Sequence, residues 1–235
     1  MLITLAGIGI VIFVLVLDTL WESEPPAFAR TETSEYFEVR YEWTFDQRRW
    51  EYEARIPITA YQYFRDRSRQ QPYSEFVLNP DDDEWLNRLA GRFSQIADDH
   101  NWGEWQTIGF VLSFVQSMPY TSDKVTTGYD NYPRYPVETI VDGGGDCEDT
   151  SILFASIVRG MGYGVVLLHL TQDAHMAAGV AISQAIVDGW NLHYPLTYYR
   201  DGDRLYAFCE TTGTGWKLGQ KPPDLGGAVA ILKLH

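Results

Sequence analysis

Apolar and polar residues alternate with a period of two in two neighbouring stretches, a pattern that predicts a β-hairpin. Residues 37–45 place aromatic side chains and one valine between charged or polar ones, and residues 50–58 repeat the pattern in the opposite phase. Alternate side chains of a strand share a face, so each stretch is expected to be half-buried. The short connection at 46–49 joins them. Because two strands alone are marginally stable, we expect the hairpin, residues 36–58, to pack on the rest of the chain rather than to form a separate binding module.

Apolar residues at helical spacing predict three helices after the hairpin. They cover residues 60–70, 80–100 and 104–118, and Pro119 ends the last of them. Three consecutive aspartates, residues 81–83, stand in the first turn of the second helix, where negative charge complements the helix dipole. A metal-binding loop is the alternative for these aspartates.

Three strands are predicted in the second half of the chain. Residues 163–170 form a continuous apolar run, residues 171–174 are a turn, and His175 begins the next strand. By the two-residue period, His175 shares a face with Ala177 and Gly179. The sheet is therefore expected to be thin on that face and to let a helix approach closely.

The last predicted strand covers residues 204–211. On it Glu210 shares a face with Tyr206, while Cys209 points the other way. We therefore expect Cys209 to be a small buried hydrophobic side chain rather than a disulfide partner of Cys147.

Between the predicted helices and strands a glycine run turns into a mostly buried helix, and Cys147 stands at that junction. Asp146 is suited to cap the helix, and Asp149 completes an acidic first turn. The N–H groups and the dipole at a helix N-terminus favour thiolate over thiol, so we expect Cys147 to be a nucleophile with a lowered pKa. Glycines 143–145 are expected to let a substrate backbone come close. The alternative is a buried structural cysteine.

Two further features admit both a functional and a structural interpretation. Gln116, near a helix end, could donate an amide N–H to an oxyanion, as amide side chains do in papain-like sites, or it could be an ordinary exposed residue. Aromatic side chains in the following loop could line a groove beside Cys147 or pack the loop on the core; they are Tyr120, Tyr129, Tyr132 and Tyr135.

Three sequence blocks resemble the signature of the transglutaminase-like superfamily, which has a papain-like thiol site. The blocks are PRYPVETIVDGGGDCEDTSILFASIVRGMGY, AHMAAGVA and FCETTGTGW. They are similar in particular to the bacterial and archaeal transglutaminase-like cysteine peptidases, and the resemblance covers residues 119–219. It implies an α+β fold in which a helix-borne cysteine packs on an antiparallel sheet. It also implies that Cys147 is the nucleophile, His175 the base and Glu210 the acid that orients the histidine, although the family usually has Asp there.

The implied chemistry is thiol-dependent acyl transfer on amide bonds. With water as the second substrate the chain is a cysteine peptidase or amidase, and with a primary amine it is a protein-crosslinking transglutaminase. The resemblance to a peptidase branch and the lack of calcium-loop motifs favour hydrolysis. A non-catalytic membrane-anchored binding module that kept the fold is the other alternative, but all three matched residues are chemically competent.

No cofactor or metal is expected. Cys147, His175 and Glu210, with Asp149, could in principle ligate zinc, but the chain has no CxxC or HExxH spacing. The formal net charge of −14, from 32 acidic and 18 basic residues, makes nucleic acid an unsuitable partner. Two cysteines are too few for a disulfide framework. The sequence leaves the oligomeric state open.

The N-terminus predicts a membrane anchor. Residues 2–17 are uninterruptedly apolar, and residues 1–21 approach the roughly 20 residues that span a bilayer. We therefore expect an anchor at 1–21, a polar linker at 22–34 and a catalytic domain at 35–235 outside the cytoplasm, acting on a protein or envelope peptide. A signal segment cleaved near Ala29 is the alternative.

Overall fold

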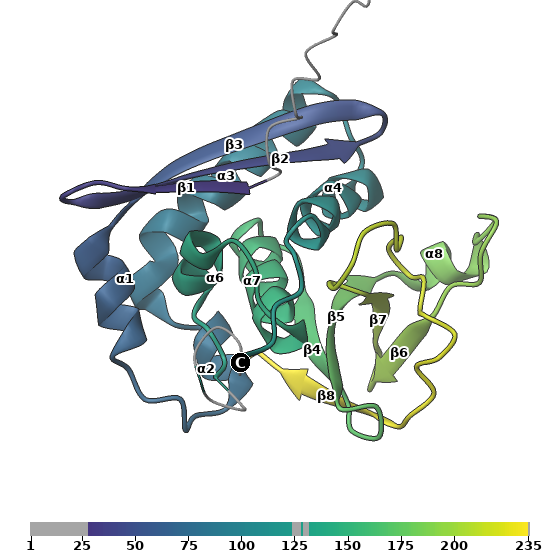
Figure 1. The fold of residues 1–235 in the computed structure, drawn as a ribbon. Helices are drawn as coiled ribbons and strands as arrows, with labels where there is room; N and C mark the ends of the chain where they lie inside the picture. Colours follow the sequence, from purple (N-terminus) through teal and green to yellow (C-terminus); the bar gives the residue numbers. More distant parts are fainter. Residues whose placement is uncertain (1–27, 124–127, 129–131, 235) are drawn as a thin grey trace, which may run out of the picture.

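The computed structural model describes residues 28–123, 128 and 132–234 of the chain, and it has the α+β architecture that the sequence predicts (Figure 1). A three-stranded antiparallel sheet covers one side of the helices and a five-stranded antiparallel sheet lies beside them. The predicted anchor, residues 1–21, lies outside the described residues. Among the helices in the described part of the chain, none is long and apolar enough to cross a membrane.

The first sheet contains the predicted hairpin and one strand that was not predicted. Its order is β1 (Phe28–Glu32), β2 (Tyr36–Phe45) and β3 (Arg48–Pro57). The prediction that residues 22–34 are only a linker is therefore wrong for β1. β1 is an edge strand whose side chains are mostly exposed on both faces, so its sequence shows no alternation of apolar and polar residues. It is held by backbone pairing with β2. Cleavage near Ala29 would cut this strand.

The hairpin packs on the helices, as expected. Asp46 and Gln47 both have positive φ, the geometry of a tight two-residue turn. The inner face of β2 is buried, and the ring of Trp43 lies 5.1 Å from that of Phe114 and 5.5 Å from that of Phe110. The contact with Phe114 is edge-on and the contact with Phe110 is tilted, and edge-on aromatic pairs stabilise a core beyond simple area burial.

The helices and the second sheet form the larger part of the structure. The helices are α1 (Ile58–Arg65), α2 (Tyr73–Val77), the short 3₁₀ helix η1 (Pro80–Asp82), α3 (Asp83–Asp99), α4 (Glu104–Gln116), α6 (Pro136–Asp142), α7 (Cys147–Gly160) and α8 (Gln184–Asp188). The strands are β4 (Val165–Leu170), β5 (His175–Ile182), β6 (Tyr198–Asp201), β7 (Arg204–Cys209) and β8 (Val229–Lys233), in the order β6-β7-β5-β4-β8.

Helix α7 is the central element of the core. It contacts α3, α4 and α6 on one side and β4 and β5 on the other, and its residues from Ile152 to Val158 are buried. The sheet presents a face to it that carries Met176, Ala178 and Cys209. This position of α7 places its first residue, Cys147, at the boundary between the helices and the sheet.

The prediction about which face of β5 admits the helix is wrong. Ala177 belongs to a second apolar cluster on the opposite face of the sheet, and a Cβ on Gly179 would meet Val166 and Tyr206 of that cluster. The small residue on the α7 side is Ala178. The sheet is curled: its two outer strands come close enough for Lys233 of β8 and Asp201 of β6 to form an ion pair of 2.7 Å. The second apolar cluster lies on the inner side of this curl.

Asp82 should make the stability of the fold depend on pH. Its side chain is fully buried, neither carboxylate oxygen has a hydrogen-bond partner among the described residues, and burial raises its pKa to about 8. Asp81 instead accepts from Tyr63 and Arg67. The folded state therefore retains a proton that the unfolded chain, with a carboxyl pKa of about 3.9, releases. Stability should fall by about 1.4 kcal/mol per pH unit between roughly pH 4 and pH 8.

The variant Asp82→Asn should be more stable than the parent at pH 8, and its slope should be smaller by about 1.4 kcal/mol per pH unit. Asp146 and Asp149, whose pKa values are raised to about 8 and about 7, keep their own contributions. Urea unfolding at pH 5 and pH 8 measures it, with the exposed Asp98→Asn as control. A slope in Asp82→Asn that is unchanged from the parent would contradict the assignment.

Candidate active site

Cys147 is the first residue of α7, as predicted. Asp146 and Asp149 form a capping box, in which the Asp146 N–H donates to Asp149 Oδ2 at 3.2 Å. This local hydrogen bonding explains why the helix begins at this residue. Cys147 is only 7% exposed and belongs to the hydrophobic core.

The three glycines before Cys147 serve internal packing and not substrate access, so this prediction is wrong. Gly143 has a φ of 72° and ends α6, with the ring of Phe28 where a Cβ would stand. A Cβ on Gly144 would meet the Pro119 carbonyl at 2.5 Å, and one on Gly145 would meet Asp149 at 2.5 Å. The glycines therefore let neighbouring segments of this chain come close to the start of α7.

His175 and Glu210 form the second part of the site. His175 Nε2 and Glu210 Oε2 are 2.9 Å apart, and the side chains are 15% and 2% exposed. The other carboxylate oxygen, Oε1, accepts from the N–H of Thr212 at 2.9 Å and from its hydroxyl at 2.6 Å. Because Nε2 faces the carboxylate, it carries the ring proton, and Nδ1 is the nitrogen left to accept one.

Short hydrogen bonds tie the start of α7 to the strand ends that carry these residues. The backbone of Met176, next to His175, lies close enough to the Cys147 thiol to lower its pKa, and the Ser151 hydroxyl donates to the Met176 carbonyl at 3.2 Å. The Thr211 hydroxyl, next to Glu210, lies 3.0 Å from that of Thr150. The structure thus brings Cys147, His175 and Glu210 into one neighbourhood from a helix and two strands.

The expected low pKa of Cys147 is not found. Burial first, and then the charge and hydrogen bonding of Glu148, raise the pKa of the thiol well above its ordinary value, against a lowering contribution from the Met176 backbone. The Cys147 Sγ lies 2.8 Å from Glu148 Oε2 and donates to it. The helix dipole is therefore outweighed by burial and by the neighbouring carboxylate, and the raised pKa favours the thiol over the thiolate.

Replacing Glu148 with glutamine should make the thiol more reactive. The change removes one negative charge beside the sulfur and keeps the side-chain shape, so the pKa of Cys147 should fall by about one unit. Alkylation of Cys147 by iodoacetamide at pH 7.5, followed by mass spectrometry, should then be about tenfold faster than in the parent, since the thiolate is the reactive form. The exposed Glu84→Gln is the control, and an unchanged rate in Glu148→Gln would contradict this account.

Gln116 supports the site through backbone contacts. Its amide nitrogen donates to the carbonyls of Glu210 at 2.7 Å and Trp216 at 2.9 Å, and the side chain is 4% exposed. Both N–H groups of the amide are thus engaged, which leaves neither for an oxyanion in this arrangement. The sequence could not identify these partners, because they lie about a hundred residues away.

Of the loop tyrosines, one lies beside Cys147 and two pack the loop on the core. Tyr120 is 60% exposed and lies near Cys147 and Asp146, and burial first, then nearby carboxylates such as Asp146, raise its pKa. Tyr132 and Tyr135 are buried and pack the loop on the core. Tyr129 lies outside the described residues.

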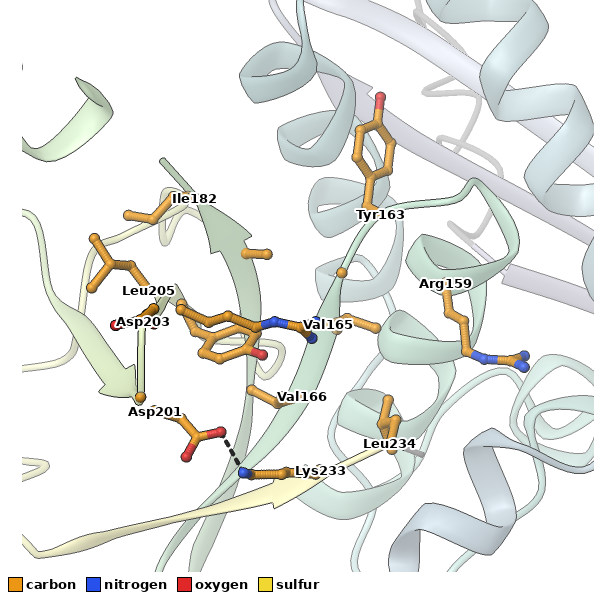
Figure 2. Close-up of a pocket in the computed structure, with 15 residues that line it drawn as sticks. Arg159, Tyr163, Val165, Val166, Ile182, Asp201, Asp203, Leu205, Lys233 and Leu234 are labelled. Atoms are coloured by element: carbon orange, nitrogen blue, oxygen red, sulfur yellow. Dashed lines mark ion pairs between the residues drawn. The ribbon is translucent and has the colours of Figure 1, made fainter. Parts of the chain in front are cut away.

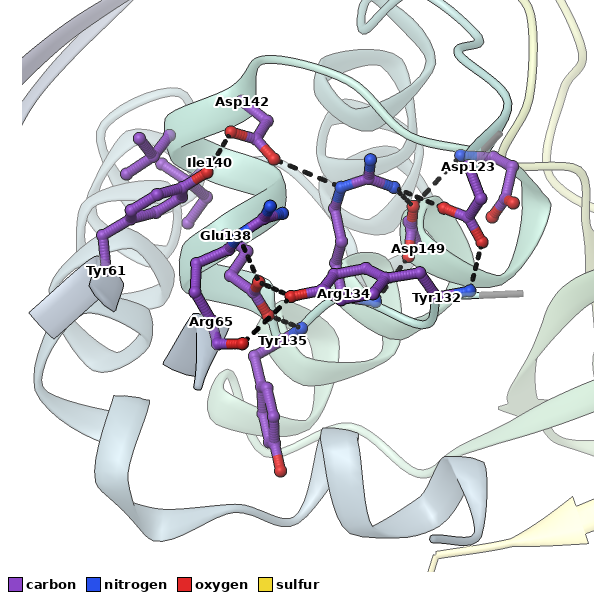
Figure 3. Close-up of polar contacts among 12 residues, drawn as sticks. Tyr61, Arg65, Asp123, Tyr132, Arg134, Tyr135, Glu138, Ile140, Asp142 and Asp149 are labelled. Atoms are coloured by element: carbon purple, nitrogen blue, oxygen red, sulfur yellow. Dashed lines mark hydrogen bonds and ion pairs between the residues drawn. The ribbon is translucent and has the colours of Figure 1, made fainter. Parts of the chain in front are cut away.

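A buried ion network beneath the start of α7 was not predicted (Figure 3). Arg134 is fully buried, and its guanidinium contacts Asp149, Asp123 at 2.9 Å and Asp142 at 3.2 Å. Its backbone N–H donates to Asp149 Oδ1 at 2.7 Å. Burial raises the pKa of Asp149 to about 7 while Arg134 lowers it, so the guanidinium stabilises the carboxylate that shapes the first turn of α7.

Three carboxylates of this region could hold a metal ion. Oxygen atoms of Asp123, Asp146 and Asp149 lie within 4.8 Å of one another, but Arg134 already contacts two of these three side chains. Within the described residues, Cys147, His175 and Glu210 do not form such a group.

A cavity between the sheet strands and the end of the chain lies away from the candidate site (Figure 2). It has a volume of about 920 Å³ and lies where β5 ends at Ile182, β7 begins at Arg204 and β8 ends at Lys233. His175 begins β5 and Glu210 follows β7, so the cavity is at the opposite end of the sheet. It takes no part in the arrangement around Cys147.

No known family model matches the chain, and no curated protein sequence matches it. Among solved structures, LapG of Legionella pneumophila is similar at 20% identity, over 62% of this chain and 81% of LapG, with a TM-score of 0.37. EGTA-treated LapG matches at 19% identity over 64% of this chain and 86% of LapG, also with a TM-score of 0.37. Calcium-bound LapG matches at 23% identity, over 43% and 66%, with a TM-score of 0.30. Similarity at this level assigns neither a family nor an activity to the chain.

Proposed function

We propose that the chain is a transglutaminase-like cysteine peptidase or amidase that hydrolyses amide bonds with Cys147, His175 and Glu210. The observation that carries the proposal is the 2.9 Å contact between His175 Nε2 and Glu210 Oε2, next to a thiol at a helix N-terminus. A nucleophile, a base and a group that orients the base are the parts that thiol catalysis requires.

In the proposed reaction, His175 Nδ1 takes the proton of the Cys147 thiol and the thiolate attacks the amide carbonyl. Glu210, held by Thr212, fixes the ring tautomer and stabilises the imidazolium. Backbone N–H groups in the first turn of α7 stabilise the oxyanion. The imidazolium then protonates the leaving amine, and water hydrolyses the acyl-enzyme with His175 again as base. The hydrogen bond from the Cys147 thiol to the Glu148 carboxylate must break first, because it holds the thiol proton away from His175 in this structure.

Two reagents test the proposal on the folded protein. Iodoacetamide should alkylate Cys147 in the native state and Cys209, which is fully buried, only after unfolding. A p-nitrophenyl ester should acylate Cys147 in a single turnover, and His175→Ala should lose this step while circular dichroism shows an unchanged fold. Equal and slow alkylation of both cysteines would remove the nucleophile assignment.

We further infer from residues 1–21 that the protein is anchored in a membrane, with its catalytic domain outside the cytoplasm and a protein or envelope peptide as substrate. The full-length chain should sediment with membranes and resist extraction by high salt, because a span of this length is held by the hydrophobic effect. A chain that lacks residues 1–21 keeps β1 and should be soluble and folded. Recovery of the unprocessed full-length chain in the soluble fraction would contradict the anchor.

A further inference from the structure

A second cavity lies beside the candidate site, and we call it the aromatic pocket. Its volume is about 550 Å³. Its lining residues come from α4, from the two loops that lie before β6 and after β7, and from the end of β2 and the β2–β3 turn; Figure 1 shows where these elements lie. The lining residues are Thr44, Phe45, Asp46, Trp105, Gln106, Gly109, Leu112, Ser113, Gln116, Leu192, Tyr194, Gly215, Trp216, Lys217 and Leu218.

The aromatic pocket is linked to the candidate site by the hydrogen bonds of one lining residue, Gln116. Gln116 lines the pocket, and its amide donates to the carbonyls of Glu210 and Trp216. Trp216 belongs to the loop that directly follows Glu210. The pocket therefore lies on the same boundary between helices and sheet that separates Cys147 from His175, and a chain bound along that boundary would pass both.

The walls of the pocket are suited to an apolar group. Trp105, Tyr194 and Trp216 are partly exposed, and Leu192 is 46% exposed, so four large apolar side chains gather with accessible surface around one cavity. Several polar groups of the walls bond within the protein: the Tyr194 hydroxyl donates to the Leu218 carbonyl at 2.9 Å, and the Ser113 hydroxyl donates to the Phe110 carbonyl at 2.7 Å. Lys217 lies over the Tyr194 ring, 5.8 Å from its centre. An aromatic ring placed here would be desolvated between aromatic walls.

We propose that the aromatic pocket is a specificity subsite that binds an aromatic or large aliphatic side chain of the peptide substrate. This inference rests on the proposed function, because the subsite acts on the same Cys147. Pockets of this kind discriminate between a large and a small apolar group by about 10- to 200-fold. The pocket thus selects peptides with a bulky apolar residue near the scissile bond.

The test uses peptidyl vinyl sulfones, which alkylate an active-site thiol without requiring turnover. In one series phenylalanine is scanned through the three positions of an alanine tripeptide. In the other, a phenyl sulfone is compared with a methyl sulfone to probe the leaving-group side. Mass spectrometry of Cys147 gives the rate for each probe. The parent should react at least about tenfold faster with the aromatic group at one position than with the all-small probe.

The variant Ser113→Phe fills the pocket, because Ser113 is a partly exposed lining residue on α4. It should reduce the aromatic preference to within about twofold and leave the rate with iodoacetamide unchanged. Gln95→Phe adds the same ring at an exposed position of α3 and should retain the parent preference.

Two results would separate the subsite from the function on which it rests. If the parent shows no preference at any position, or if Ser113→Phe keeps it, the subsite is overturned while alkylation of Cys147 still supports the nucleophile. If neither iodoacetamide nor any vinyl sulfone alkylates native Cys147, the proposed function fails, and the subsite fails with it.

Discussion

Replacing Glu210 with glutamine is expected to lower the rate of Cys147 acylation by about a hundred- to ten-thousand-fold. In the parent, Oε1 of Glu210 accepts two hydrogen bonds from Thr212, so the amide oxygen of glutamine will take that position. The amide NH₂ then faces His175 Nε2 and can only donate to it. Nε2 becomes the unprotonated nitrogen, and Nδ1 carries the proton. His175 can then no longer accept the thiol proton.

Single-turnover acylation by a p-nitrophenyl ester measures this effect, with circular dichroism as the control for folding. Glu210→Asp should fall between parent and glutamine variant, because the shorter side chain reaches His175 less well. Asp188→Asn is the matched control: Asp188 is exposed and accepts from Gln184 at 2.9 Å, away from His175. If Asp188→Asn lost acylation while Glu210→Gln kept it, the orienting acid would be misassigned.

Replacing Arg134 with methionine is expected to destabilise the protein by about 3–5 kcal/mol. Both Arg134 and Asp149 are fully buried, and Asp123 is 3% exposed. Removing the guanidinium leaves negative charge in the core without its main compensation, which costs more than the ion pair itself contributes. For a chain of this length the melting temperature should fall by on the order of 10 °C.

Thermal unfolding of Arg134→Met measures the loss, and Arg92→Met, an exposed change on α3, is the control. The double variant Arg134→Met with Asp149→Asn should recover part of the stability, because it removes one of the uncompensated charges. If the double variant lost the sum of both single losses, the charge of Asp149 would not be what Arg134 compensates. A change of less than about 1 kcal/mol for Arg134→Met would mean that the network is solvated.

The predicted parts of the fold are those whose signal is local. The period of two identified β2 and β3, the helical spacing identified α3 and α4 with boundaries within a few residues, and the capping residues identified the start of α7. His175 was placed at the start of its strand for the same reason, since a turn and an apolar run lie next to each other in the sequence. Neither local pattern could reveal β1, whose formation depends on its partner strand.

Other features of the site depend on residues that are distant in sequence. Glycines 143–145 were interpreted as an opening for a substrate, but Phe28 and Pro119 fill that space. The partners of Gln116 come from residues 210 and 216, and the acidic partners of Arg134 come from three separate segments. The raised pKa of Cys147 likewise reflects burial, which only the folded chain determines.

The sequence by itself therefore determined the order and type of most elements, the residue at the start of α7 and the candidates Cys147, His175 and Glu210. Hydrogen bonding between neighbouring residues and the periodicity of burial act over a few positions, so they are visible in the sequence. The tertiary structure alone decided the face of β5 that meets α7, the burial that raises the pKa of the Cys147 thiol, the partners of Gln116 and the burial of Arg134. These follow from desolvation and from contacts between distant segments, which arise only when the chain has packed.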